Sequence, residues 1–137
     1  MTVSFEHRLP STDEHGALAA SVGWSDHFDD SSIGQSLAGS TFGVVAIVDG
    51  LAVGMGRVVG DGIHYFYLQD VIVRPEHADD GLGSQIVGHL LDQIAAVAPS
   101  EAFVGLFASP EAVDLYREFR FTTTDMTGMH RFVQPGA

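Results

Sequence analysis

Apolar residues recur with helical spacing in four segments of the chain. The longest segment, 84–98, has apolar side chains at Ile86, Val87, Leu90, Leu91 and Ile94. Three shorter helices are expected over 12–22, 33–38 and 110–119, and each follows an oxygen-bearing cap residue or a proline start signal. The pattern therefore predicts four helices separated by extended segments.

Alternating or β-branched runs predict five strands, which span 3–9, 42–48, 51–59, 63–73 and 102–108. One or two further edge strands are expected within 121–133. Asp49-Gly50 and Asp61-Gly62 are hairpin signals, so the second, third and fourth strands should form an antiparallel meander. A meander followed by a strand–helix–strand crossover predicts an α+β fold with a mixed sheet packed between helices.

The composition is that of a folded protein with an acidic surface. The chain has 137 residues, 45% of them apolar, which favours one domain over 1–137. The formal net charge is −12, so neither nucleic acid nor a membrane is expected as a partner. The chain shows no cysteine, signal peptide or bilayer-spanning segment, and we expect a cytoplasmic protein. The seven histidines lack ligand spacing, so no metal site is expected.

The stretch 67–94 joins an apolar strand to a loop with glycines and then to a helix expected to start near Ser84. Glycines let the backbone approach a ligand, and the first helical turn aims N–H groups and a partial positive charge at it. This arrangement predicts a phosphate-binding loop. Asp79 and Asp80 stand in the same loop and repel anions, whereas His77 can offset them when it is protonated.

Several motifs in this order resemble the GNAT superfamily of acyl-CoA-dependent N-acyltransferases over nearly the whole chain. They are Gly54-Met55-Gly56-Arg57-Val58, Val71-Ile72-Val73-Arg74-Pro75 with Gly81-Leu82-Gly83, Leu115-Tyr116 with Phe121, and Gly128-Met129. The resemblance implies the GNAT fold, in which the fourth strand splays from the fifth in a mostly antiparallel sheet with about four helices. It also implies transfer of acetyl from acetyl-CoA to a primary amine of a small molecule, by direct attack in a ternary complex. Many family members dimerise, so a homodimer is also expected.

The same resemblance assigns roles to individual residues. The backbone of Val71, Ile72 and Val73 would hold pantetheine and polarise the thioester carbonyl. The pyrophosphate loop would comprise Asp79, Asp80, Gly81, Leu82, Gly83 and Ser84, and Ser109 stands where relatives commonly carry Asn.

Two residues are candidates for the proton transfers. Tyr116 matches the family tyrosine that faces the sulfur, which implies a general acid for the departing thiolate; a core aromatic is a compatible role. Asp70 is the candidate base, acting through water. The alternative for Asp70 is a structural carboxylate that caps a loop or pairs with Arg57.

Four residues are candidates for the acceptor pocket. Trp24, His27 and Phe28 lie between the first two helices, where the family forms part of that pocket. Helix–helix packing is the alternative, above all for Trp24. Gln69 is the fourth candidate, and it can face the pocket together with Asp70 only if the strand contains a bulge.

A second hypothesis belongs to a different class of protein. Ala78, Asp79 and Asp80 replace the glutamine or arginine, the glycine and the basic or small residue that are usual in the family, and Arg120 replaces a glycine. These departures motivate a degenerate GNAT-fold binding or regulatory protein with weakened or lost CoA binding. An acyl group other than acetyl also remains open.

Overall fold

A computed structural model describes residues 2–136. The chain forms two compact units, Met1–Leu106 and Phe107–Ala137. The first unit contains the sheet and three α-helices, and the second contains the last α-helix and the C-terminal segment. No helix of the described residues is long and apolar enough to span a bilayer.

The first unit is built on a five-stranded sheet whose spatial order follows the chain order. The strands are β1 (Ser4–Glu6), β2 (Phe42–Val48), β3 (Leu51–Gly60), β4 (Tyr65–Val73) and β5 (Phe103–Gly105). Neighbours from β1 to β4 pair antiparallel, and β4 pairs parallel with β5. The predicted meander and α+β class are therefore confirmed. The first and last of these strands are shorter than their patterns suggested.

The helices of the first unit are α1 (Thr12–Ser21), α2 (Ile33–Ala38) and α3 (Leu82–Val97), with 3₁₀ turns η1 (Ser25–His27) and η2 (Pro75–His77). A capping box starts α1, because the Ser11 hydroxyl accepts from the Glu14 N–H and the Glu14 carboxylate accepts from the Ser11 N–H. Gly81, at φ 76°, starts α3 two residues earlier than expected.

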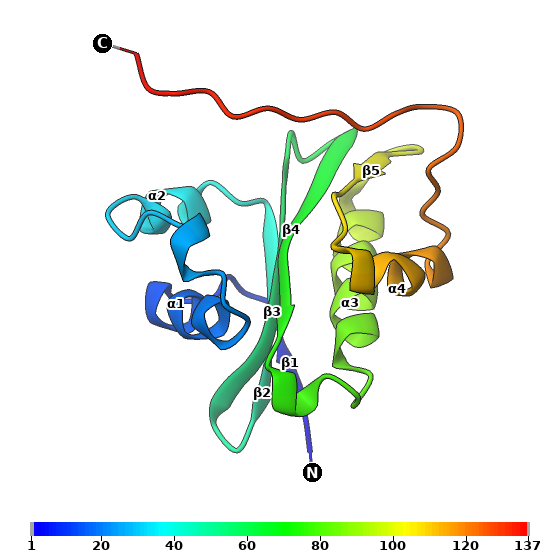
Figure 1. The fold of residues 1–137 in the computed structure, drawn as a ribbon. Helices are drawn as coiled ribbons and strands as arrows, with labels where there is room; N and C mark the ends of the chain where they lie inside the picture. The colour runs from blue at the N-terminus through cyan, green and yellow to red at the C-terminus, as the bar shows by residue number, and fades with distance from the viewer. Residues whose placement is uncertain (1, 137) are drawn as a thin grey trace. The chain divides into compact units, whose positions relative to one another are not determined.

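Helices cover both faces of the sheet, with α1 and α2 on one face and α3 on the other (Figure 1). On the α1 face, Leu18 packs in one buried cluster with residues of the sheet, which are Val45, Ala52, Met55 and Ile72. On the α3 face, Gly54 lets the helix approach closely, since a Cβ there would lie 2.8 Å from the Ile86 Cδ1 atom. Burying each large aliphatic side chain contributes roughly 1.5–3 kcal/mol.

Pairing between β4 and β5 is short. It joins only 65–67 of β4 to Phe103–Gly105. Beyond Tyr67, no described strand pairs with this edge of β4, so 68–73 form ladder bonds with β3 alone. This is the separation of the fourth and fifth strands that the GNAT fold requires.

The second unit contains the turn η3 (Pro110–Ala112) and the helix α4 (Val113–Glu118). Beyond α4, the described residues up to Gly136 form no strand, so the prediction of edge strands within 121–133 was wrong. Arg120 takes a left-handed conformation at φ 69°, which glycine adopts more readily. The structure thus explains why relatives favour glycine where this chain has Arg120.

Candidate functional site

The loop between β4 and α3 has the geometry of an anion site. Gly81 is the N-cap of α3, and no side chain caps the helix. The Gln85 N–H donates to the Gly81 carbonyl, which is the first carbonyl of the helix. The N–H groups of residues 82–84 therefore have no acceptor within the helix. A Cβ on Gly81 would meet nothing within 4 Å, which leaves the backbone there open to a ligand.

The acidic side chains of this loop differ in their surroundings. The His77 Nδ1 atom lies 2.9 Å from the Asp80 Oδ2 atom, so His77 is placed to neutralise Asp80 when it carries a proton. Asp79 is exposed, and no hydrogen bond or ion pair joins its side chain to another described residue. The predicted juxtaposition of His77 with the loop acids is therefore present for Asp80.

A β-bulge interrupts β4 at Asp70. Met55 pairs with Ile72 and Arg57 pairs with Gln69, so β4 has one residue more than β3 between these pairs. Asp70 takes φ 56°, a conformation that an aspartate tolerates better than most residues. The bulge turns two consecutive side chains toward each other, and the Gln69 amide donates to the Asp70 Oδ1 atom at 2.8 Å.

The Asp70 carboxylate is the centre of a buried hydrogen-bond network. Its Oδ2 atom lies 3.0 Å from His15 Nε2 and accepts from Arg57 Nε at 2.9 Å. Asp70 is 5% exposed and Arg57 is 6% exposed. The Arg57 guanidinium also donates to the Ser36 carbonyl and the Ser40 hydroxyl, which connects the sheet to the end of α2.

These contacts decide the charge state of Asp70. Burial alone would raise the pKa of the carboxyl, but the hydrogen bonds from His15 and Gln69 and the charge of Arg57 outweigh burial and hold the pKa below its usual range. A carboxylate with a lowered pKa and partners on both oxygens is a weak proton acceptor. This favours the structural alternative for Asp70, a pair with Arg57, over the role of base.

His15 was not recognised in the sequence as a site residue. It stands three positions before Leu18 on the buried side of α1 and is 1% exposed. The sequence signal for this role is a histidine among the apolar positions of a helix. Such a histidine is buried and therefore needs a buried polar partner. That partner, Asp70, lies 55 positions away in the chain.

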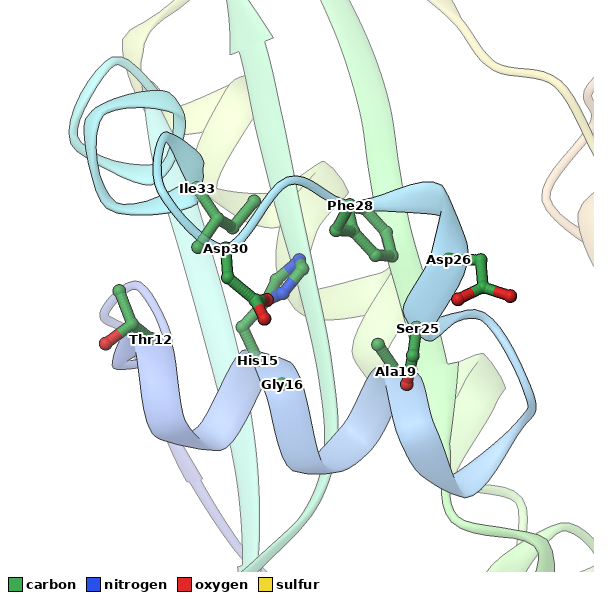
Figure 2. Close-up of a pocket in the computed structure, with 9 residues that line it drawn as sticks. All are labelled: Thr12, His15, Gly16, Ala19, Ser25, Asp26, Phe28, Asp30 and Ile33. Atoms are coloured by element: carbon green, nitrogen blue, oxygen red, sulfur yellow. The ribbon is translucent and has the colours of Figure 1, made fainter.

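A pocket of about 470 Å³ lies between α1 and the segment that runs from η1 to α2 (Figure 2). Its lining residues come from α1, η1 and the following loop, and they are Thr12, His15, Gly16, Ala19, Ser25, Asp26, Phe28, Asp30 and Ile33. The Phe28 ring meets the His15 ring edge-on, with centroids 4.6 Å apart. Acidic and aromatic side chains thus surround a buried histidine.

The four predicted pocket residues are not all brought together. Phe28 lines the pocket, whereas Trp24, His27 and Gln69 are not among its lining residues. Trp24 packs against the core cluster of the α1 face, which consists of Leu18 and sheet residues. His27 meets the Trp24 ring edge-on, and Gln69 binds Asp70 instead.

The remaining candidates belong to the second unit. Tyr116 of α4 is 8% exposed, and its ring meets that of Phe121 at 81° with centroids 5.7 Å apart. Ser109 is the N-cap of η3 and makes no side-chain cap hydrogen bond. Within residues 2–136, no three His, Cys, Asp or Glu side chains gather as metal ligands would.

Comparisons with known proteins agree on the fold. The family model described as an acetyltransferase (GNAT) domain matches residues 11–133, which span parts of both units. No curated protein matches the chain.

Three solved structures are similar to the chain. A probable acetyltransferase of unknown function from methicillin-resistant Staphylococcus aureus is 26% identical with a TM-score of 0.86, and the match covers 98% of this chain and 100% of that one. A GNAT-family acetyltransferase from Streptococcus pneumoniae is 24% identical with a TM-score of 0.81 and the same coverage. An aminoglycoside acetyltransferase from an uncultured soil sample is 14% identical with a TM-score of 0.71, and both chains are covered completely.

Proposed function

We propose, since the chain belongs to the GNAT acetyltransferase family, that it transfers an acetyl group from acetyl-CoA to a primary amine of a small molecule. The observation that carries the proposal is the junction of β4 and α3. An unpaired edge of β4 leads into an open loop, and the loop leads into a helix start that no side chain caps. Backbone donors are thus left for a long anionic ligand.

The fit of acetyl-CoA to this junction rests on backbone groups. The N–H groups at residues 79 and 81–84 would hold the pyrophosphate, since the Asp80 N–H already donates to the His77 carbonyl. Val71, Ile72 and Val73 would hold the pantetheine arm. A backbone N–H fixed on this strand would also stabilise the oxyanion that develops on the thioester carbonyl. Ser109 of the second unit would offer its hydroxyl to the same cosubstrate.

Direct attack requires a neutral amine beside the thioester and a proton for the departing thiolate. We assign that proton donor to Tyr116, by the match of its position to the family motif. Tyr116→Phe should therefore lower kcat by about 10²-fold or more while leaving the Kd for acetyl-CoA unchanged. A variant that turns over at the wild-type rate would remove Tyr116 from the reaction.

The acceptor is assigned to the pocket on the α1 face. The pocket lies beside His15, which contacts Asp70 in the bulge of β4, so acceptor and acyl arm would meet at one strand. Asp26 and Asp30 line the pocket, and none of its lining residues is lysine or arginine, which suits an amine that arrives as a cation.

Calorimetric titration with acetyl-CoA at low and at high salt tests the function directly. Binding at either salt concentration, followed by release of free thiol when primary amines are added, is the expected result. Acetyl-CoA should bind more weakly at low salt than at high salt, because salt screens the repulsion between the acidic loop and the phosphates. A protein that binds no acetyl-CoA at any salt concentration is instead a degenerate member of the family.

A further inference from the structure

The pocket on the α1 face holds a histidine with one ring nitrogen fixed and one left available. His15 Nε2 is bonded to Asp70, and no hydrogen bond joins Nδ1 to any described residue. Nδ1 is thus the ring nitrogen that Asp70 leaves available, and His15 lines the pocket.

The carboxylate determines which nitrogen of the ring is basic. An ionised Asp70 can only accept hydrogen bonds, so the contact requires the proton on His15 Nε2. In the neutral ring, Nδ1 then carries the free lone pair. The pair has the arrangement of a carboxylate-oriented base, with Asp70 as the positioning residue and Arg57 holding Asp70 in place.

The groups that face His15 favour a cation in front of it. Asp26 of η1 and Asp30 of the following loop line the same pocket, and Asp70 of β4 lies behind the ring. The only basic side chain of the network is Arg57 of β3, which is already paired with Asp70. The negative charge of these carboxylates would attract an entering ammonium group, which would find a base at the buried end of the pocket.

We propose that His15 is the proton acceptor for an amine that enters this pocket as its ammonium ion; this rests on the proposed acetyl transfer. Nδ1 of neutral His15 takes one proton from the ammonium nitrogen. The freed lone pair forms the C–N bond to the thioester carbonyl carbon, and the C–S bond breaks. The departing CoA thiolate takes the proton of the Tyr116 hydroxyl, the second proton of the nitrogen replaces it on Tyr116, and the proton on His15 returns to solvent.

His15→Gln separates the base from its structural contact. The glutamine amide can still donate to Asp70 from the place of Nε2, but it has no basic nitrogen in the place of Nδ1. With 2-phenylethylamine and 1,4-diaminobutane as acceptors, kcat/KM should fall about 10²-fold or more near neutral pH. The loss should shrink as the pH approaches that at which the amines lose their own protons. His64→Gln, on an exposed hairpin of the same unit, is the matched control and should leave the profile unchanged.

A spectroscopic measurement tests the same assignment without turnover. Ring ¹⁵N–¹H correlation spectra of the seven histidines, with His15 assigned by its loss in His15→Gln, should show a protonated Nε2 and an unprotonated Nδ1 at high pH. Adding 1,4-diaminobutane should shift the Nδ1 signal.

The outcomes distinguish this assignment from the proposed function. If wild-type protein binds acetyl-CoA and acetylates an amine, but His15→Gln keeps the wild-type pH profile or His15 shows the opposite tautomer, only the assignment of His15 is overturned. If wild-type protein binds no acetyl-CoA, the proposed function fails and this assignment fails with it. A kcat/KM that falls near neutral pH in folded His15→Gln and recovers toward the pH at which the amines lose their own protons, together with the expected tautomer, supports both.

Discussion

At the scale of single residues, Asp70 combines three features that rarely occur together. It is buried, it takes a left-handed backbone conformation, and its side chain receives hydrogen bonds from three other residues. Removing one partner of a buried ion pair leaves an uncompensated charge, which is far more destabilising than loss of an exposed pair. The main role of Asp70 is therefore to hold Arg57 and His15 in place.

Asp70→Asn tests this role against that of a base. Asparagine tolerates the same backbone conformation, so the change mainly removes the charge that compensates Arg57. The free energy of unfolding, measured in urea, should fall by about 3–5 kcal/mol. Asp92→Asn, at an exposed position of α3, should change it by less than about 0.5 kcal/mol. If Asp70→Asn lowers turnover at unchanged stability, Asp70 takes part in the chemistry instead.

The limits of sequence reasoning are also clearest at this scale. The sequence allows Asp70 to be a base, or a structural carboxylate that caps a loop or pairs with Arg57, and the structure shows the pair with Arg57. The contact with His15 was not foreseen, since it depends on how α1 packs on the sheet and on a bulge that rotates Asp70. Local patterns report which face of a helix is buried but not which distant side chain it meets.

At the scale of elements, β4, its loop and α3 form one continuous segment, to which the proposed cosubstrate site is assigned. The hairpin signals and the helical spacing predicted these elements, because each depends on local backbone preferences. The expected strands within 121–133 did not form, although the pattern resembled that of a strand. Strand formation depends on a neighbouring strand to pair with, and a sequence pattern cannot supply that information.

Asp80→Arg tests whether the start of α3 is the phosphate site. A unit charge pair about 6 Å apart contributes roughly 0.7 kcal/mol in water-like surroundings, so a change of two charges is worth about 1.4 kcal/mol. The Kd for acetyl-CoA should therefore fall about tenfold at low salt, measured by calorimetry, and the gain should shrink at high salt.

Asp92→Arg is the matched control for this experiment. It makes the same charge change on an exposed position of α3, about 15 Å further along the helix than Leu82. A charge at that distance acts on the phosphates more weakly than one at Asp80, because the interaction falls with distance and salt screens it further. If both variants tighten binding equally, net charge matters and the loop does not. If neither changes the Kd, acetyl-CoA does not lie against this loop.

At the scale of the whole molecule, two electrostatic effects act in opposite directions as the pH falls. The formal net charge of −12 at pH 7 destabilises the compact state through self-repulsion, and protonation of the seven histidines relieves part of it. Carboxylates with lowered pKa values act the other way. A hydrogen bond from Arg8 lowers the pKa of Glu14 from 4.5 to about 2, and the pKa of Asp70 is also held below its usual range.

The sign of each effect gives the expected pH dependence of stability. A group whose pKa is lower in the folded protein stabilises it above the unfolded pKa, and this contribution is lost as the pH falls through the folded pKa. For Glu14 that loss runs from pH 4.5 to about 2.

Thermal unfolding followed by circular dichroism should therefore show a Tm that is highest near about pH 5 and falls steeply below about pH 4. Added salt should raise the Tm at pH 7, where self-repulsion is largest, and change it little near about pH 5. A Tm that does not change with salt at pH 7 would mean that self-repulsion is negligible, and a Tm unchanged down to about pH 2 would contradict the role of Glu14 and Asp70.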